Sequence, residues 1–279
     1  MIIRTLVENT TSDHRLSCEH GISLYIEYDD HRVLFDVGAG SLFAENALKM
    51  GIDIASIDFL VISHGHSDHG GGLNTFLELN HTAKVYIHKS AFEPHFSLKL
   101  GELVDIGLDP ALKNHRQIIL TDDYVRIDEH AFIFSGVSGN RFFPSMNKNL
   151  YKGYERPIQD DFDHEQNLII EDSGTRLLSI GCAHHGIINI LDYVRQTYQI
   201  VPTDVIGGFH MSSRSEIQGE KPEIVRSVAR ELRLNKTTYY TGHCTGKDAY
   251  QMMKKILGKQ LQKFTTGKSI RMTKEENHE

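Results

Sequence analysis

The stretch that decides the fold runs SHGHSDHGGG over residues 63–72. Four of its side chains can bind a metal ion, and they fall within six positions: His64, His66, Asp68 and His69. Side chains two apart on an extended segment share a face, so His64 and His66 point the same way. The following turn carries the other two to a different side, and its glycines let the backbone bend tightly. A hydrophobic core does not require four such polar side chains close together, so the stretch predicts a metal site.

The sequence around this stretch alternates short apolar runs with amphipathic segments. The run 58–62 (DFLVI) predicts a strand just before the motif, and a helix is expected over 70–80. Further strands are predicted at 22–28, 32–36, 84–88, 131–136, 167–171, 175–180, 203–208, 237–241, 262–264 and 268–272. Further helices are predicted at 41–50, 186–198, 222–234 and 246–257. Two facing mixed sheets with helices outside, an α/β sandwich of αββα layers, satisfy this pattern.

Length and composition are those of a globular protein. We expect the 279 residues to form a single domain over 1–272, with 273–279 as a frayed tail. The net charge of −7 argues against binding to nucleic acid or to anionic lipid. No stretch approaches the ~20 apolar residues that cross a bilayer, so no membrane partner is expected. Three widely spaced cysteines indicate no disulfide framework, which favours a reduced, cytoplasmic location. The sequence makes no prediction of the oligomeric state.

The motif HGHSDH resembles the HxHxDH signature of the metallo-β-lactamase superfamily, whose αββα sandwich is the architecture inferred above. Three other segments are similar to that family's motifs and come in the same order: Phe35-Asp36-Val37-Gly38, Gly181-Cys182-Ala183-His184 and Gly242-His243. The resemblance runs over nearly the whole chain. More narrowly, the chain resembles the branch of the 7,8-dihydropterin-6-methyl-4-(β-ribofuranosyl)aminobenzene-phosphate synthase-like proteins. The segments that carry this second likeness are 19–23 (EHGIS), 207–210 (GGFH), 241–246 (TGHCTG) and 266–268 (TGK).

The resemblance implies two divalent metal ions. One ion would be held by His64, His66 and His184, and the other by Asp68, His69 and His243. Neutral imidazoles with one carboxylate suit Zn²⁺, and Mn²⁺ or Fe is compatible with the same ligand types. Asp68 would also orient the attacking water.

His210 stands where most dinuclear members of the superfamily place a bridging aspartate. A neutral imidazole offers one lone pair and cannot bridge two ions as a carboxylate does. Three roles therefore stay open for His210: a ligand of one metal, a hydrogen-bond partner of the substrate, or a catalytic proton donor.

Other residues are expected around the ligands. Asp36 would sit beneath the metals and orient ligand imidazoles through their other N–H group. Glu19 and His20 could line the cleft, and His185 is expected on the substrate side or in a structural role. Cys182 and Cys244 each adjoin a ligand histidine. A thiolate would bind Zn²⁺ well, so a ligand role is the alternative for each. Because enough nitrogen and oxygen ligands exist, we expect both to be small buried residues.

The polar and aromatic segment 139–165 shows little periodicity, and a loop of this length is either a functional lid or disordered.

The leading functional hypothesis is a hydrolase with a dinuclear centre that activates water against a small, anionic phosphoester or related ester. His210 or His20 would protonate the leaving group. One alternative is a condensing synthase that joins a pterin to an aminobenzene ribosyl phosphate and releases pyrophosphate. The other is a sensor that keeps the metal site to bind a ligand without turnover.

Overall fold

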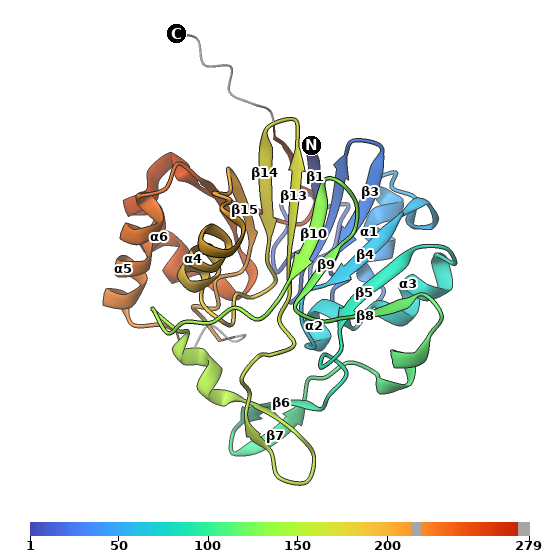
Figure 1. The fold of residues 1–279 in the computed structure, drawn as a ribbon, viewed down its shortest axis with the longest axis horizontal. Helices are drawn as coiled ribbons and strands as arrows, with labels where there is room; N and C mark the ends of the chain where they lie inside the picture. The colour runs from blue at the N-terminus through green and yellow to red at the C-terminus, as the bar shows by residue number, and fades with distance from the viewer. Residues whose placement is uncertain (214–218, 273–279) are drawn as a thin grey trace.

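The computed structural model describes residues 1–213 and 219–272, and its centre is a pair of facing seven-stranded sheets (Figure 1). The first sheet has the order β18-β1-β2-β3-β4-β5-β8. Its strands are β1 (Ile2–Val7), β2 (Ser23–Tyr28), β3 (His31–Phe35), β4 (Phe59–Ile62), β5 (Lys84–His88), β8 (Ile118–Thr121) and β18 (Ser269–Arg271). From β3 to β8 these strands run parallel, whereas β18, β1, β2 and β3 pair antiparallel.

The second sheet has the order β17-β16-β15-β14-β13-β10-β9. Its strands are β9 (Tyr124–Arg126), β10 (Ala131–Phe134), β13 (Asn167–Asp172), β14 (Thr175–Ser179), β15 (Asp204–Gly207), β16 (Thr238–Thr241) and β17 (Leu261–Lys263). Here the strands from β14 to β17 run parallel. A third, four-stranded sheet lies below the sandwich in Figure 1. It is built from β12 (Ile158–Gln159), β11 (Leu150–Lys152), β6 (His95–Lys99) and β7 (Glu102–Asp105).

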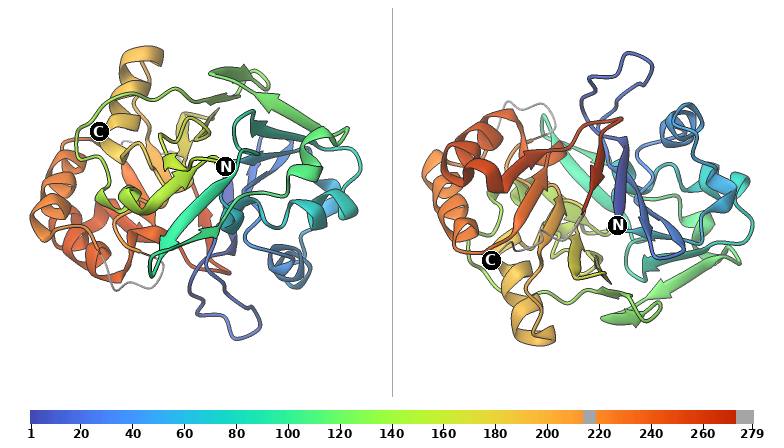
Figure 2. Two further views of the ribbon diagram at one scale, coloured as in Figure 1. Left: turned by 90° about the horizontal axis from the view of Figure 1, so that it is seen from below. Right: turned by 90° about the horizontal axis from the view of Figure 1, so that it is seen from above.

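Helices cover the outer face of each large sheet, which gives the four layers visible in Figure 2. The first sheet is covered by α1 (Leu42–Lys49) and α3 (Leu73–Leu79). The second is covered by α4 (Ile187–Tyr198), α5 (Pro222–Arg233) and α6 (Lys247–Leu257). The short α2 (Ser67–Gly70) lies at the sheet edge, and five 3-10 helices join other elements: η1 (Ile54–Ser56), η2 (Pro110–Asn114), η3 (Ser145–Asn149), η4 (His243–Thr245) and η5 (Gly258–Gln260). None of the helices in the described ranges is long and apolar enough to cross a membrane.

Apolar burial explains why several strands read as continuous hydrophobic runs. All four residues of β4 and all four of β10 are buried, because a sheet between two layers is covered on both faces. Ile26, Val61 and Leu168 belong to the cluster between the two sheets. Separate clusters fill the space beneath the helices on each outer side, with Phe76 in one and Val228 in the other.

The topology brings the chemically active residues to one edge. Parallel strands end on the same side of a sheet, and side chains that follow their carboxyl ends meet there. Asp36 follows β3, and the motif 63–69 follows β4. On the facing sheet His184 follows β14, His210 follows β15 and His243 follows β16.

The predicted αββα sandwich is confirmed, with differences in its details. The strand β1 was not predicted. The helix expected over 70–80 is the shorter α3, and α2 precedes it within the motif. Gly71 and Gly72 lie between the two helices, where any side chain would meet backbone oxygens within 2.5 Å. The segment 139–165 contains the 3-10 helix η3 and the strands β11 and β12, which are too short to show alternation in the sequence. The tail 273–279 lies outside the described residues.

Candidate metal centre

Several residues at or next to the site have a left-handed backbone conformation. Asp36, Ala183, His210 and His243 all have a φ between 47° and 60°, a region that non-glycine residues rarely adopt. Each follows a strand that ends at the same edge, so the backbone turns sharply there and aims a side chain into the site. Such conformations cost about 1–3 kcal/mol each and persist where surrounding structure enforces them.

The first group of candidate ligands contains His64, His66 and His184. All three are at most 4% exposed, and one ring nitrogen of each lies within 4.8 Å of the others. Their Nε2 atoms are buried and have no hydrogen-bond partner among the described residues. Burial lowers the pKa of each imidazole well below its usual value, so the rings are neutral and offer lone pairs.

Hydrogen bonds on the opposite ring nitrogen fix the tautomers of two members of this group, His64 and His184. Ser63 Oγ donates to Asp36 Oδ2 at 2.8 Å, so it accepts from His64 Nδ1–H at 2.9 Å. Asn147 donates its Nδ2 to the His184 carbonyl at 2.8 Å, and its Oδ1 accepts from His184 Nδ1–H at 3.0 Å. Both histidines therefore carry their proton on Nδ1 and leave the Nε2 lone pair for an ion.

The second group contains Asp68, His69 and His243. His69 donates Nδ1–H to Asp36 Oδ2 at 2.6 Å, and His243 donates Nδ1–H to Asn9 Oδ1 at 2.9 Å. Their Nε2 atoms then face each other across only 3.2 Å. Asp68 Oδ2 lies 3.4 Å from His243 Nε2 and 3.8 Å from His69 Nε2. Two lone pairs and a carboxylate around one point repel each other unless a cation lies between them, so these residues fit a metal ion.

A proton takes the place of the cation in the ion-free protein. Burial lowers the pKa of His69, but the carboxylates of Asp36 and Asp68 outweigh it and raise that pKa to about 9. Burial raises the pKa of Asp68, and this is outweighed by His69, His20 and His243, which hold it well below its usual range. A metal ion that enters must displace this proton.

His20 and Glu19, predicted at the cleft, take different positions. His20 accepts from Asn9 Nδ2 on Nδ1 at 3.2 Å and donates Nε2–H to Asp68 Oδ2 at 3.3 Å. It therefore orients Asp68, whose side chain is 23% exposed. Glu19 accepts from the Ala39 backbone N–H at 3.1 Å and supports a turn.

His210 and His185 also differ from each other in their contacts. The ring centroid of His210 lies 4.2 Å from that of His184, and neither ring nitrogen has a hydrogen-bond partner within the described part of the chain. His210 is thus at the site and free to act. His185 is held instead by Glu165, which accepts its Nδ1–H at 2.7 Å and its backbone N–H at 3.0 Å. Of the two predicted roles of His185, this contact supports the structural one.

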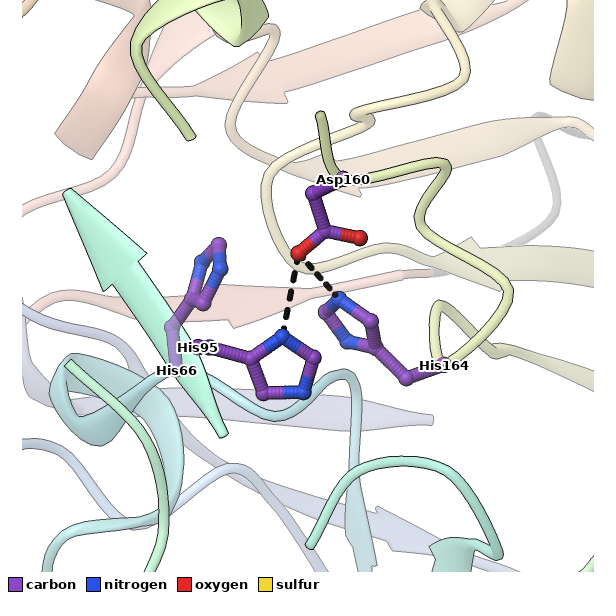
Figure 3. Close-up of side chains that lie close together, drawn as sticks. All are labelled: His66, His95, Asp160 and His164. Carbon is purple, nitrogen blue, oxygen red and sulfur yellow. Dashed lines mark hydrogen bonds and ion pairs between the residues drawn. The ribbon is translucent and has the colours of Figure 1, made fainter. Parts of the chain in front are cut away.

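A further buried set, which sequence analysis did not find, lies beside His66 (Figure 3). Asp160 Oδ2 accepts from His95 Nδ1 at 3.0 Å and from His164 Nε2 at 3.3 Å. His164 accepts the Gly65 backbone N–H on Nδ1 at 2.9 Å, which forces its proton onto Nε2. Although the four side chains lie close enough for an ion, His164 therefore serves as a donor to Asp160 and as a support for the motif.

Several supporting residues have no signal in the sequence. Asn9 and Asn147 carry no motif, and they lie far along the chain from the histidines that they hold. Glu8 is 1% exposed and accepts the His243 backbone N–H at 2.7 Å. The dense acidic run 160–165 (DDFDHE) was the one available signal for Asp160 and Glu165.

Comparison with known proteins now identifies the family. The sequence model of the family described as the metallo-beta-lactamase superfamily matches residues 18–197. The chain belongs to the metallo-β-lactamase superfamily. A solved structure described as a metal-dependent hydrolase of the beta-lactamase superfamily has a TM-score of 0.78 and 27% identity, and the match covers 98% of this chain and 99% of that one.

Two curated relatives of this superfamily member come from Methanocaldococcus jannaschii. An uncharacterised protein is 29% identical over 77% of this chain and 81% of its own length. The 7,8-dihydropterin-6-methyl-4-(beta-D-ribofuranosyl)-aminobenzene-5'-phosphate synthase is 26% identical over 91% of this chain and 90% of its own length. The resemblance to the synthase branch is thereby confirmed at the level of sequence.

Proposed function

We propose that this protein is a metal-dependent hydrolase with a dinuclear centre that acts on a small phosphoester or related ester. The observation that carries the proposal is the convergence of Nε2 atoms from His64, His66 and His184 on one side and His69 and His243 on the other. Divalent ions bound there, with Zn²⁺ as the first candidate and Mn²⁺ or Fe as others, would lower the pKa of water and polarise a phosphoryl or carbonyl group.

The protein's own residues supply orientation and proton transfer. Asp68, held by His20 and partly exposed, would orient the attacking water. His210 has no partner for either ring nitrogen among the described residues, and imidazole suits proton transfer near neutral pH. We assign to it the proton that the leaving group needs.

A small anionic substrate would have its charge balanced by the metal ions and not by Arg141 or Lys152 of the segment 139–165. Arg141 is bound by Asp192 at 2.7 Å and Glu231 at 2.8 Å, and Lys152 by two aspartates. These basic residues of the segment 139–165 are therefore neutralised, and the metal ions would have to balance the substrate's charge. The phosphate in the name of the synthase relative supports the same substrate class.

The test is turnover of a panel of aryl phosphomonoesters, phosphodiesters and lactones by protein loaded separately with Zn²⁺, Mn²⁺ and Fe²⁺. Asp68→Ala should lose at least about 100-fold in kcat, the usual contribution of one positioned acid–base group. Asp53→Asn is the matched control, since Asp53 caps the remote helix η1 and asparagine can cap it equally. No turnover of any substrate by a fully loaded protein contradicts the hydrolase proposal, as does an unaffected rate in the Asp68 variant.

The second candidate is a condensing synthase, favoured by the relative that carries that activity in its name. Incubation with a pterin diphosphate and an aminobenzene ribosyl phosphate should then yield a coupled product and pyrophosphate. Pyrophosphate released without coupling indicates hydrolysis instead.

A further inference from the structure

Cys182, expected from the sequence to be a small buried residue, lies at the centre of the site. Its Sγ is 3.2 Å from His69 Nε2. It also lies within 4.8 Å of a ring nitrogen of His64, of His184 and His210, and of His243. The thiol is therefore within reach of both candidate ligand groups, and the left-handed backbone at Ala183 turns the chain between it and His184.

The distances around Cys182 match those expected between ligands of a single ion. With bonds of about 2.0–2.3 Å to nitrogen and sulfur, the ligand atoms of a tetrahedral zinc site lie about 3.3–3.6 Å apart. Cys182 Sγ to His69 Nε2 measures 3.2 Å, His69 Nε2 to His243 Nε2 3.2 Å, and His243 Nε2 to Asp68 Oδ2 3.4 Å. The four donor atoms thus follow one another at ligand-to-ligand spacing, while His69 Nε2 and Asp68 Oδ2 lie 3.8 Å apart and Cys182 lies within 4.8 Å of a His243 ring nitrogen.

Charge gives a second, independent argument. Among the described groups that face this metal position, Asp68 is the one carboxylate, since Asp36 lies behind His69 and is bound to Ser63. Two divalent ions would bring four positive charges into a buried site, and His210 adds none of the negative charge needed to balance them. A thiolate supplies an anionic ligand to Zn²⁺ or another thiophilic ion.

We propose that Cys182 would serve as a further ligand of the metal ion that Asp68, His69 and His243 would hold. This inference rests on the proposed dinuclear centre. In the ion-free protein Cys182 Sγ and His69 Nε2 are joined by a hydrogen bond, and binding of an ion through both atoms would release the thiol proton of Cys182 together with the proton on His69 Nε2.

Cys244 offers a matched control because it is also buried and lies beside Cys182 and His243. Its Sγ accepts the His210 backbone N–H at 3.3 Å and packs against Gly208, where an added side-chain carbon would lie only 2.4 Å from the sulfur. Its sulfur is therefore engaged with backbone. The third cysteine, Cys18, is exposed, whereas Cys182 and Cys244 are buried.

The experiment is cobalt substitution of the full-length chain, read by absorption. Wild type and Cys244→Ser should show the near-ultraviolet charge-transfer band of a thiolate bound to Co²⁺. Cys182→Ser should lack that band and bind its second Co²⁺ at least about tenfold more weakly, the loss that follows removal of even an outer partner of a metal ligand.

X-ray absorption at the zinc edge keeps the test independent of whether Cys182→Ser folds. Zinc-loaded wild type should show a sulfur neighbour at about 2.3 Å. A wild-type protein that binds zinc through nitrogen and oxygen alone overturns the role of Cys182 and leaves the dinuclear centre intact. A band that survives in Cys182→Ser and vanishes in Cys244→Ser also overturns it. Wild type that binds no ion refutes both proposals.

Discussion

Asp36→Asn should reverse the direction of the hydrogen bonds that prepare the metal ligands. The wild-type Oδ2 accepts from His69 Nδ1 at 2.6 Å and from Ser63 Oγ at 2.8 Å. An amide nitrogen in that place donates to both. His69 must then accept on Nδ1, and Ser63 must donate to His64 Nδ1. Both histidines would carry their proton on Nε2, where the ions bind.

The size of the effect follows from these contacts. One reversed histidine falls in each ligand group, and loss of a partner that orients a ligand costs about 10–100-fold in metal affinity. Each site should therefore weaken by about 1.4–2.7 kcal/mol. Stability of the metal-free protein should fall by only about 1–3 kcal/mol, because the buried hydrogen bonds are reversed rather than removed and lose chiefly their charge.

Competition with a chromophoric chelator measures both affinities, and urea unfolding of the metal-free protein measures stability. Ser63→Ala is the comparison variant, since it removes the 2.9 Å hydrogen bond to His64 and only a longer, 3.4 Å contact to His69, whose 2.6 Å bond to Asp36 stays in place. It should weaken the site of His64 more than that of His69. If a folded Asp36→Asn protein bound both ions with wild-type affinity, the tautomer argument would be wrong.

Three further outcomes follow from the structure. Gly65→Ala should destabilise the protein by about 1–3 kcal/mol in urea unfolding, because the added methyl group would lie 2.5 Å from the Ala91 carbonyl and 2.8 Å from the His95 ring. Gly40→Ala is the control and should leave the unfolding curve unchanged, because its added methyl group meets nothing within 4 Å. A chelator should lower the Tm measured by calorimetry, and restored Zn²⁺ should raise it by an amount that grows with free ion, whereas an unmoved Tm would show that no ion binds the native state. Arg141→Ala should leave KM for an anionic substrate unchanged, because two carboxylates already bind the guanidinium, and should cost less than about 1 kcal/mol of stability; a large rise in KM would place Arg141 in the substrate site.

The sequence allowed the motif to be found because its functional groups are neighbours along the chain. His64 to His69 fall in one short stretch, and His184 and His243 each follow an apolar strand. The strands on both sides of the sandwich were predictable for a related reason, since burial on two faces leaves long apolar runs.

The residues that orient the ligands could not be predicted in the same way. Asn147 meets His184 only because η3 and the end of β14 pack together, and polar side chains of this kind look alike in a loop or in a site. Cys182 was discounted because a ligand count appeared complete without it. Its distance from His69 depends on how two strands of different sheets face each other, which no local pattern records.

The pairing of β1 with β18 also determines when the protein can finish folding. Ile2 pairs with Arg271, and Glu8, just beyond β1, holds the backbone of His243. Figure 2 shows this last described strand, in red, beside the first, in blue. A nascent chain leaving the ribosome therefore exposes the HGHSDH turn long before its opposing ligands exist, and the edge of β1 that β18 covers stays open until residues 269–271 have emerged. Metal loading at the complete centre must in consequence wait until the segment that carries His243 has been made.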